Sequence, residues 1–357
     1  MNVFPEIYNN FVCIKKRECY TVNELVMAYR QKKEDGKLLE YAEFLARELE
    51  EIGQERTARA YRTVAKGLVM YNKNTDIPLQ QISVGLIKSF ENHLKEKGRL
   101  PNTVSYYMRN LRAIYNKAVA SKKIGYSYKE RPFADVYTGV DKTVKRALTL
   151  EEIKRLNAID FTALLRQEKI NSPAYMHIKN LNFAWRLFFF CFFARGMCFI
   201  DLAYLRKDNI KREMIKYCQK RTGRQIEVKV TDQLQTIINS FSNDVKGSPY
   251  LFPILKKKEK LPLQYDSALR IQNNRLHELS EMAGIKKPVT THVSQHSWAT
   301  IGKQVNVPIR VLRECLEYSD NKTNPDYLGL LDNSLLDVAN ELITSAVIHP
   351  HSFFDTK

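Results

Sequence analysis

Residues 187–194, with the sequence LFFFCFFA, form the most apolar stretch of the chain. Arg186 and Arg195 bracket this stretch, which is far too short to span a bilayer. It completes a longer helical pattern over residues 180–194. We therefore expect these residues to form the buried middle of a core helix, around which the rest of a domain packs.

The segments on either side predict a domain over residues 148–347. Before the apolar stretch, Thr149-Leu150-Glu151-Glu152 has the pattern of a capping box at the start of a helix. After it, residues 214–219 and 225–230 alternate apolar and polar side chains around Arg221-Thr222-Gly223-Arg224, which predicts a β-hairpin with glycine in the turn. Further helical patterns cover residues 231–241, 265–283, 295–304, 308–316 and 333–346. The fold class is mainly α with a small antiparallel sheet.

A second domain is predicted over residues 37–125. Residues 38–52 place apolar side chains on one helical stripe, and three more helical segments follow at 53–72, 82–97 and 103–123. Four helices with short connections make a small all-α domain. Residues 1–36 are a basic N-terminal extension, with at most a short helix at 22–32.

Charge predicts a polyanionic partner. The 357 residues include 57 Lys and Arg and 39 Asp and Glu, which gives a net charge of +18. This excess favours nucleic acid first and an anionic membrane surface second. Residues 126–147 form a basic segment that we interpret as a linker between the domains, although solvated linkers are also often charged.

The chain shows no targeting signal, and its six cysteines include no CxxC pair and no Cys/His cluster typical of zinc sites. A reduced cytoplasmic compartment fits this pattern best. The motifs GxxxxGK[ST], GxGxxG, HExxH and GxSxG are also absent, so nucleotide hydrolysis, dinucleotide redox chemistry, zinc proteolysis and α/β-hydrolase chemistry lack support.

A few polar residues in apolar surroundings remain as candidates for chemistry. Arg195 follows the apolar helix, His292 and His296 lie four apart, and Tyr327 lies in the polar segment NKTNPDYLGL. Each has a plainer explanation when taken alone. An arginine after a helix is favoured by the helix dipole, and paired histidines more often satisfy local hydrogen bonds than bind metal.

The order and spacing of six segments resemble the tyrosine recombinases of the phage-integrase family, and most closely the branch found in mobile elements of Bacteroides-type bacteria. The resemblance spans about residues 38–347. It rests on the following segments: ENHLKEKGRLPNTVSYYMRNLRAIYNKAV, KRALTLEEIKRL, FFARGMCFIDLAYL, KYCQKRTGRQIEV, THVSQHSWATI and LEYSDNKTNPDYLGLLDNSLLDVANELI. It implies a helical core-binding (SAM-like) domain that clamps DNA, followed by a tyrosine-recombinase catalytic domain.

The resemblance also implies a chemistry. In this family a tyrosine phenol attacks a DNA phosphodiester and forms a 3′-phosphotyrosine with a free 5′-hydroxyl. The bond energy is kept, so neither ATP nor a metal is needed, and we expect no cofactor. Fixed Arg and His donors stabilise the negative charge of the transition state, while a Lys protonates the leaving oxygen.

Four catalytic positions match the family pattern. Arg195 matches the first catalytic Arg, and Asp201 matches an acidic residue that supports the site from the same segment. His292 matches the first His of the His-x-x-Arg-His box. Tyr327 matches the nucleophile. Asp337 and Asn340 match markers of the last helix, which we interpret as mainly structural.

Three positions depart from the pattern. Gln295 stands where the family has its second Arg, and Arg221 stands at the Lys position, with Lys220 adjacent as a substitute. Tyr318 stands where the family has the His of Leu-Gly-His. Gln brings no charge to a phosphate, and Arg is a poor general acid because its pKa stays above about 12. These departures leave open an impaired or inactive enzyme.

The resemblance also implies partners. We expect double-stranded DNA and a homo-oligomer, a tetramer, on that DNA, with no membrane role and a cytoplasmic, nucleoid-associated location. Residues 333–346 and the tail, 348–357, are candidates for contact with a neighbouring protomer. The short N-terminal extension weakly favours a reaction without distant arm sites. Candidate phosphate contacts are Arg56, Arg59, Arg62, Arg109 and Arg112.

Three functions therefore stay open at the level of sequence. The first is a site-specific recombinase. The second is a DNA-binding homologue that has lost the chemistry and has an accessory or regulatory role, which the departures at Gln295, Arg221 and Tyr318 motivate. The third is a basic helical protein that binds RNA or anionic lipid; the clamp-like helices weigh against it.

Overall fold

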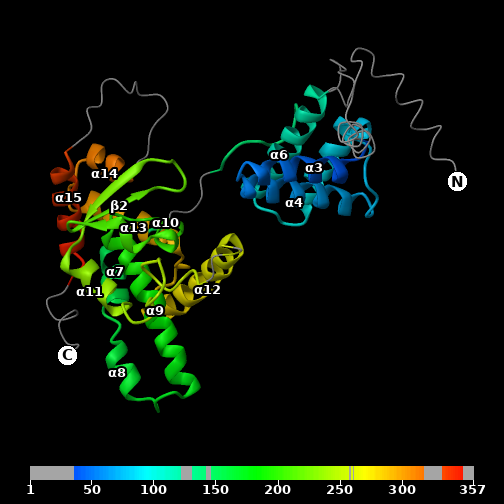
Figure 1. The fold of residues 1–357 in the computed structure, drawn as a ribbon. Helices are drawn as coiled ribbons and strands as arrows, with labels where there is room; N and C mark the ends of the chain where they lie inside the picture. Colours follow the sequence, from blue (N-terminus) through cyan, green and yellow to red (C-terminus); the bar gives the residue numbers. More distant parts are fainter. Residues whose placement is uncertain are drawn as a thin grey trace. The chain divides into compact units, whose positions relative to one another are not determined.

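The computed structural model describes residues 36–121, 131–141, 146–256, 259, 261–316 and 332–348. The chain divides into two compact units, Met1–Thr143 and Val144–Lys357 (Figure 1). The predicted short helix at 22–32 lies outside the described residues, as do Tyr318, Tyr327 and residues 349–357 of the tail.

Unit 1 contains the four predicted helices. Their bounds are α3 Leu38–Glu51, α4 Glu55–Tyr71, α5 Val84–Glu96 and α6 Pro101–Ala120, with a short 3-10 turn, η1, at Leu79–Gln81. Local chemistry sets two of the starts: the Ser83 hydroxyl accepts a hydrogen bond from the Leu86 amide at the start of α5, and Pro101 occupies the first turn of α6. All four helices bury apolar side chains in one core, including those of Leu45, Leu68, Phe90 and Ile114.

Residues 131–141, which fall within the predicted linker, pack on unit 1. Phe133 is buried in the unit 1 core, and the Tyr137 amide donates a hydrogen bond to the Glu91 carboxylate at 3.1 Å. Glu91 itself is buried. Burial alone would raise its pKa, but Lys88, Lys95 and the Tyr137 amide outweigh this and lower the pKa to about 2. A buried carboxylate on α5 thus holds this segment, while the predicted domain boundaries stay predictions.

Unit 2 is mostly helical with one small sheet. Its elements are α7 Leu150–Asn157, α8 Phe161–Arg166, α9 Pro173–Phe193, α10 Phe199–Tyr204, η2 Lys207–Asn209, β1 Ile210–Lys211, β2 Met214–Cys218, β3 Gln225–Lys229, α11 Asp232–Ser240, α12 Leu261–Met282, α13 Thr291–Gln304, α14 Ile309–Leu316 and α15 Asn333–Ser345. The predicted fold class is confirmed. The capping box is also present, because the Thr149 hydroxyl and the Glu152 carboxylate each accept a hydrogen bond from the other's backbone amide.

Helix α9 is the centre of unit 2. Every residue from Leu187 to Ala194 is buried, as predicted, and α9 packs against α8, α11, α12, α13 and α15. The helix begins earlier than the pattern at 180–194 indicated, because Ser172 caps it and Pro173 occupies its first turn. Figure 1 shows α8 beside the first half of α9, at the end of the unit away from the sheet.

The sheet is antiparallel, in the order β1-β2-β3. Strands β2 and β3 form the predicted hairpin, with Met214 opposite Lys229 and Cys218 opposite Gln225. Gly223 lies in the turn with a φ of 74°, a left-handed conformation that glycine adopts readily. Strand β1, of two residues, was not predicted, since so short a segment carries no periodicity.

No helix in the described part of the chain is long and apolar enough to cross a membrane. Among the same residues, no group of three or more His, Cys, Asp or Glu side chains is arranged to hold a metal ion.

Candidate active site and nucleic-acid interface

Six of the predicted catalytic residues lie in described parts of unit 2. They are Arg195, Asp201, Lys220, Arg221, His292 and Gln295. They come from the end of α9, from α10, from the β2–β3 turn and from the first turns of α13. The other two, Tyr318 and Tyr327, belong to residues 317–331, which lie outside the described residues.

Arg195 is buried directly after the central helix. Helix α9 ends at Phe193, and the backbone then turns through left-handed conformations at Arg195 and Gly196, with φ values of 55° and 68°. The Arg195 side chain is only 4% exposed, and its Nη2 donates a hydrogen bond to the carboxylate of Asp337 on α15. Its Nε is buried without a hydrogen-bond partner among the described residues.

Gln295 lies against the turn that follows Arg195. A Cβ atom built on Gly196 would approach the Gln295 Cα to 3.0 Å. Position 196 therefore favours glycine for two reasons, namely this close packing and its positive φ. The Cys198 thiol donates a weak hydrogen bond to Gln295 Oε1 at 3.9 Å. The structure therefore brings the end of α9 and the first turns of α13 together, with the Gln295 side chain buried between them.

Asp201 connects α10 with the hairpin turn. Its side chain is 3% exposed, and its Oδ1 accepts a hydrogen bond from the Lys220 amide at 2.8 Å. Its Oδ2 is buried with no partner in the described part of the chain. Burial raises the pKa of Asp201 to about 6, while the Lys220 amide and the charges of Lys220 and Arg221 oppose the rise. Asp201 therefore places the two basic residues at the turn.

The two basic residues of the turn differ in their surroundings. The Lys220 ammonium lies 4.2 Å from the centre of the Tyr204 ring, a cation–π contact that holds an exposed side chain near α10. Arg221 is also exposed, and its charge acts on both Asp201 and Cys198. Burial raises the pKa of the Cys198 thiol, and the Asp201 charge adds to the rise.

His292 lies in the first turn of α13 and is exposed, one turn before the buried Gln295. The start of this helix is held by the Thr291 amide, which donates a hydrogen bond to Asn273 Oδ1 at 2.9 Å. His296 is exposed as well.

One contact at this site could not be predicted from the sequence, namely the hydrogen bond between Arg195 and Asp337. The pattern at 333–346 indicated a helix, and the family resemblance marked Asp337 as mainly structural, but nothing local relates it to Arg195. Burial raises the pKa of the Cys315 thiol to about 11, with the Arg195 charge opposing the rise and the Asp337 charge adding to it. The buried thiol therefore lies within the electrostatic reach of both members of the pair.

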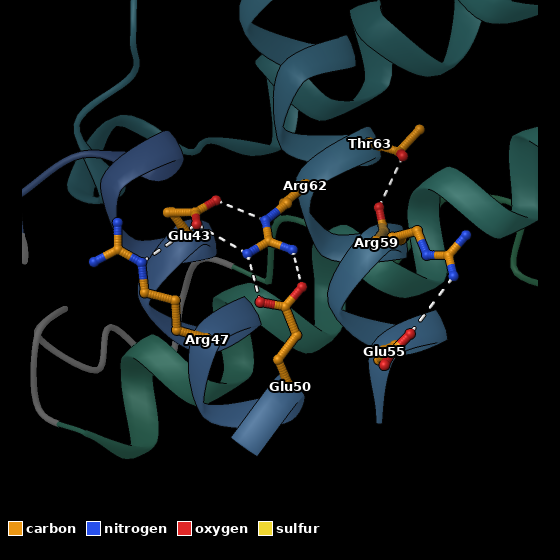
Figure 2. Close-up of polar contacts among 7 residues, drawn as sticks. All are labelled: Glu43, Arg47, Glu50, Glu55, Arg59, Arg62 and Thr63. Carbon is orange, nitrogen blue, oxygen red and sulfur yellow. Dashed lines mark hydrogen bonds and ion pairs between the residues drawn. The ribbon is translucent and has the colours of Figure 1, made fainter. Parts of the chain in front are cut away.

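The predicted phosphate contacts in unit 1 fall into two groups. Arg62 is held by two carboxylates of α3: its Nε lies 2.7 Å from Glu43, and its Nη1 pairs with Glu50 (Figure 2). Hydrogen bonds from Arg62 lower the pKa values of both carboxylates, and bonds from both raise the pKa of Arg62. Arg47 also lies 3.4 Å from Glu43. This network joins α3 to α4.

The other predicted contacts are exposed side chains. Arg56 and Arg59 lie on α4, and Arg109 and Arg112 lie on α6. Arg59 pairs with Glu55 one turn earlier at 3.8 Å (Figure 2). A pair of this kind, exposed on both sides, adds little to stability.

Comparison with known proteins agrees with this organisation. Residues 37–132 match the family model of the phage integrase SAM-like domain. The tyrosine recombinase XerA of Pyrococcus furiosus is 26% identical over 191 residues, which cover 53% of this chain and 58% of that protein. The chain thus matches little more than half the length of this curated relative.

Solved structures share the fold. The lambda integrase tetramer bound to a Holliday junction superposes with a TM-score of 0.55 at 14% identity, covering 90% of this chain and 88% of that one. The Tn1549 transposon integrase in complex with transposon right end DNA gives a TM-score of 0.50 at 13% identity, covering 80% and 92%. The chain is therefore similar in sequence to tyrosine recombinases, and it has the fold of the core-binding and catalytic domains of integrases.

Proposed function

We propose that this chain is a site-specific DNA recombinase that cuts and rejoins DNA through a 3′-phosphotyrosine at Tyr327. The observation that carries the proposal is the grouping of Arg195, Asp201, Gln295 and the Lys220–Arg221 turn in unit 2. Four separate segments supply these residues. The likeness of the fold to integrases and the match of residues 37–132 to a phage integrase SAM-like domain support it.

The proposed cleavage step is a transesterification. The Tyr327 phenol gives its proton to solvent water, and its oxygen forms a bond to the phosphorus while the bond from phosphorus to the 5′-oxygen breaks. Lys220 protonates the leaving 5′-oxygen, which becomes a hydroxyl. Rejoining is the reverse reaction with a different 5′-hydroxyl. Because the phosphotyrosine keeps the energy of the broken bond, the reaction needs no cofactor.

In this proposal, three residues contribute unequally to stabilising the negative charge on the phosphate in the transition state. Arg195 supplies the buried cation at the phosphate, His292 donates from the first turn of α13, and Gln295 donates a hydrogen bond without charge. Losing one positioned transition-state donor typically costs about 10²- to 10³-fold in rate. We therefore expect slow cleavage compared with a site that has arginine in place of Gln295.

The proposal includes partners and a setting. We infer binding to double-stranded DNA through Arg56, Arg59, Arg109 and Arg112, with assembly into a tetramer on that DNA and residues 333–348 among the contacts between protomers. The lambda integrase of the compared structure is a tetramer on a Holliday junction. We assign to Tyr318 the hydrogen-bond donor role that the family resemblance implies for its place in the sequence. We also infer that the chain is a mobile-element integrase of the Bacteroides-type branch and that it acts on nucleoid DNA in the cytoplasm.

The test uses suicide substrates, which are DNA from the chain's own element nicked close to the cleavage site so that the 5′-end diffuses away. Wild-type protein should form an SDS-resistant adduct. Tyr327→Phe should form none, while Tyr175→Phe, a matched change on the first half of α9, should form as much adduct as wild type. Salt-sensitive binding without any adduct would replace this proposal with the binding-only alternative.

A further inference from the structure

We infer that Asp337 is a positioning residue for Arg195: it fixes the orientation of the guanidinium so that the remaining donors face the scissile phosphate. The inference rests on the proposed function and assigns a role that the sequence pattern did not give to Asp337. It depends on the hydrogen bond from Arg195 Nη2 to the Asp337 carboxylate.

Burial makes this pair consequential. The Arg195 side chain is 4% exposed and that of Asp337 is 17% exposed. A guanidinium removed from water needs a compensating charge nearby, and removing one partner of such a pair leaves an uncompensated buried charge. Asp337 is the carboxylate that pairs with Arg195 among the described residues.

The ion pair uses only part of the hydrogen-bonding capacity of the Arg195 guanidinium. A guanidinium has five N–H donors in a rigid planar fork, so fixing one nitrogen fixes the direction of the others. Asp337 binds Nη2, while the buried Nε has no partner in the described part of the chain. An orphaned buried donor is costly unless an acceptor arrives. A non-bridging phosphate oxygen is such an acceptor.

The helix that carries the carboxylate is bonded to the end of α9. One turn after Asp337 on α15, the Asn340 amide donates a hydrogen bond to the Phe193 carbonyl at 2.8 Å and accepts one from the Trp298 indole at 2.8 Å. Phe193 is the last residue of α9, directly before the turn that carries Arg195. Asp337 therefore lies one turn from a residue of α15 that is bonded to the end of α9, just before Arg195.

The charge test compares Asp337→Asn with Asp208→Asn. Asp208 lies in η2 and pairs with Arg206 at 3.2 Å, but both side chains are at least half exposed, so its loss should leave the reaction unchanged. Asp337→Asn should slow adduct formation by about 10- to 100-fold, less than loss of a donor itself, and Asp337→Glu should recover most of that rate. DNA affinity at fixed salt should stay within about twofold for all three variants.

A second substrate separates positioning from a general loss of structure. A methylphosphonate at the scissile position has a neutral methyl group in place of one charged oxygen, so it demands less charge from Arg195. On this substrate Asp337→Asn should lose less than about threefold, since little charge remains to be compensated. An equal loss on both substrates, or a rate like that of Asp208→Asn on the phosphodiester, overturns the inference.

Failure of the proposed function has a different signature. If wild type forms no adduct on either substrate, a double-mutant cycle of Arg195→Gln and Asp337→Asn still tests the pair through the midpoint of unfolding in urea. Both tryptophans of the chain, Trp185 and Trp298, lie in unit 2, so their fluorescence follows this unit. Non-additive losses support the pairing, whereas additive losses overturn it.

Discussion

The guanidinium of Arg195 donates a hydrogen bond to the carboxylate of Asp337, 142 residues further along the chain. The same two elements are joined a second time, because Asn340 on α15 binds the last carbonyl of α9 at Phe193. Two hydrogen bonds thus join the end of the most apolar helix to the helix that follows the Tyr327 segment. This arrangement connects the central core to the proposed chemistry.

The hairpin turn offers a test of which basic residue protonates the leaving group. If Lys220 is the general acid, Lys220→Gln should slow cleavage of a normal phosphodiester by about 10²- to 10⁴-fold. A substrate with sulfur as the bridging 5′-atom has a leaving group that needs no proton, so there the loss should shrink below about tenfold. Arg221→Gln should lose equally on both substrates, and Arg224→Gln in the same turn is the control. If the sulfur substrate restored the rate of Arg221→Gln but not that of Lys220→Gln, the general acid would be Arg221 and not Lys220.

Position 295 tests the effect of a missing charge. Gln295→Arg should raise the rate of adduct formation by about 10- to 100-fold, because it restores a charged donor at the phosphate. Gln295 is buried, so the new charge should also lower the urea midpoint of unit 2 as seen by tryptophan fluorescence. Gln304→Arg, an exposed change at the end of the same helix, is the control. No gain in rate despite a folded variant would contradict the role of residue 295.

Asp201 predicts a stability that depends on pH. Its pKa is raised from 3.8 to about 6, mainly by burial, so between these values the folded state binds more protons than the unfolded state. The contribution of Asp201 to stability is therefore greatest below about pH 4 and falls as pH rises through about 6, by roughly 3 kcal/mol in all at about 1.4 kcal/mol per unit of pKa.

The measurement is urea unfolding of unit 2 between pH 4 and 8, in wild type and Asp201→Asn. The stability of the variant relative to wild type should increase across this range. Asp208→Asn, at an exposed carboxylate paired with Arg206, should run parallel to wild type. A constant difference between wild type and Asp201→Asn, or one of opposite sign, would contradict the raised pKa.

Unit 1 predicts that two sets of arginines act differently. Arg62→Gln should speed hydrogen exchange of α3 and α4 amides by about three- to tenfold, because it breaks the contacts with Glu43 and Glu50 (Figure 2). Arg109→Gln with Arg112→Gln should leave exchange unchanged, but it should lower the slope of log affinity against log salt by about 1 for each lost phosphate contact. If both variants showed the same hydrogen exchange, the division into a structural Arg62 and DNA-contacting Arg109 and Arg112 would be contradicted.

Patterns of apolar residues predicted most of the fold. Period-3.6 spacing located α3 and α5, and the alternation around Gly223 located the hairpin. The short helices α8 and α10, of six residues each, were not predicted, because six residues make fewer than two helical turns and show no clear periodicity. The polar first half of α9 escaped because its apolar stripe begins only near Leu181.

The site was predictable only where a segment has its own signature. Arg195, Asp201 and the Lys220–Arg221 turn lie in such segments, and the structure places them together. The partner of Arg195 was not predictable, since no local spacing relates residues so far apart in the chain. Arg62 shows the converse: it was a candidate phosphate contact together with Arg56 and Arg59, but carboxylates on the preceding helix hold it.

The most direct measurement is the identification of the residue and the DNA end in the covalent adduct. After nuclease and trypsin digestion, mass spectrometry should find a nucleotide on the peptide that contains Tyr327, and not on the separate peptide that contains Tyr318. The cleaved strand should have its 3′-phosphate on the protein and a free 5′-hydroxyl on the other fragment. A nucleotide on another residue, or a linkage through the 5′-end, would contradict the account.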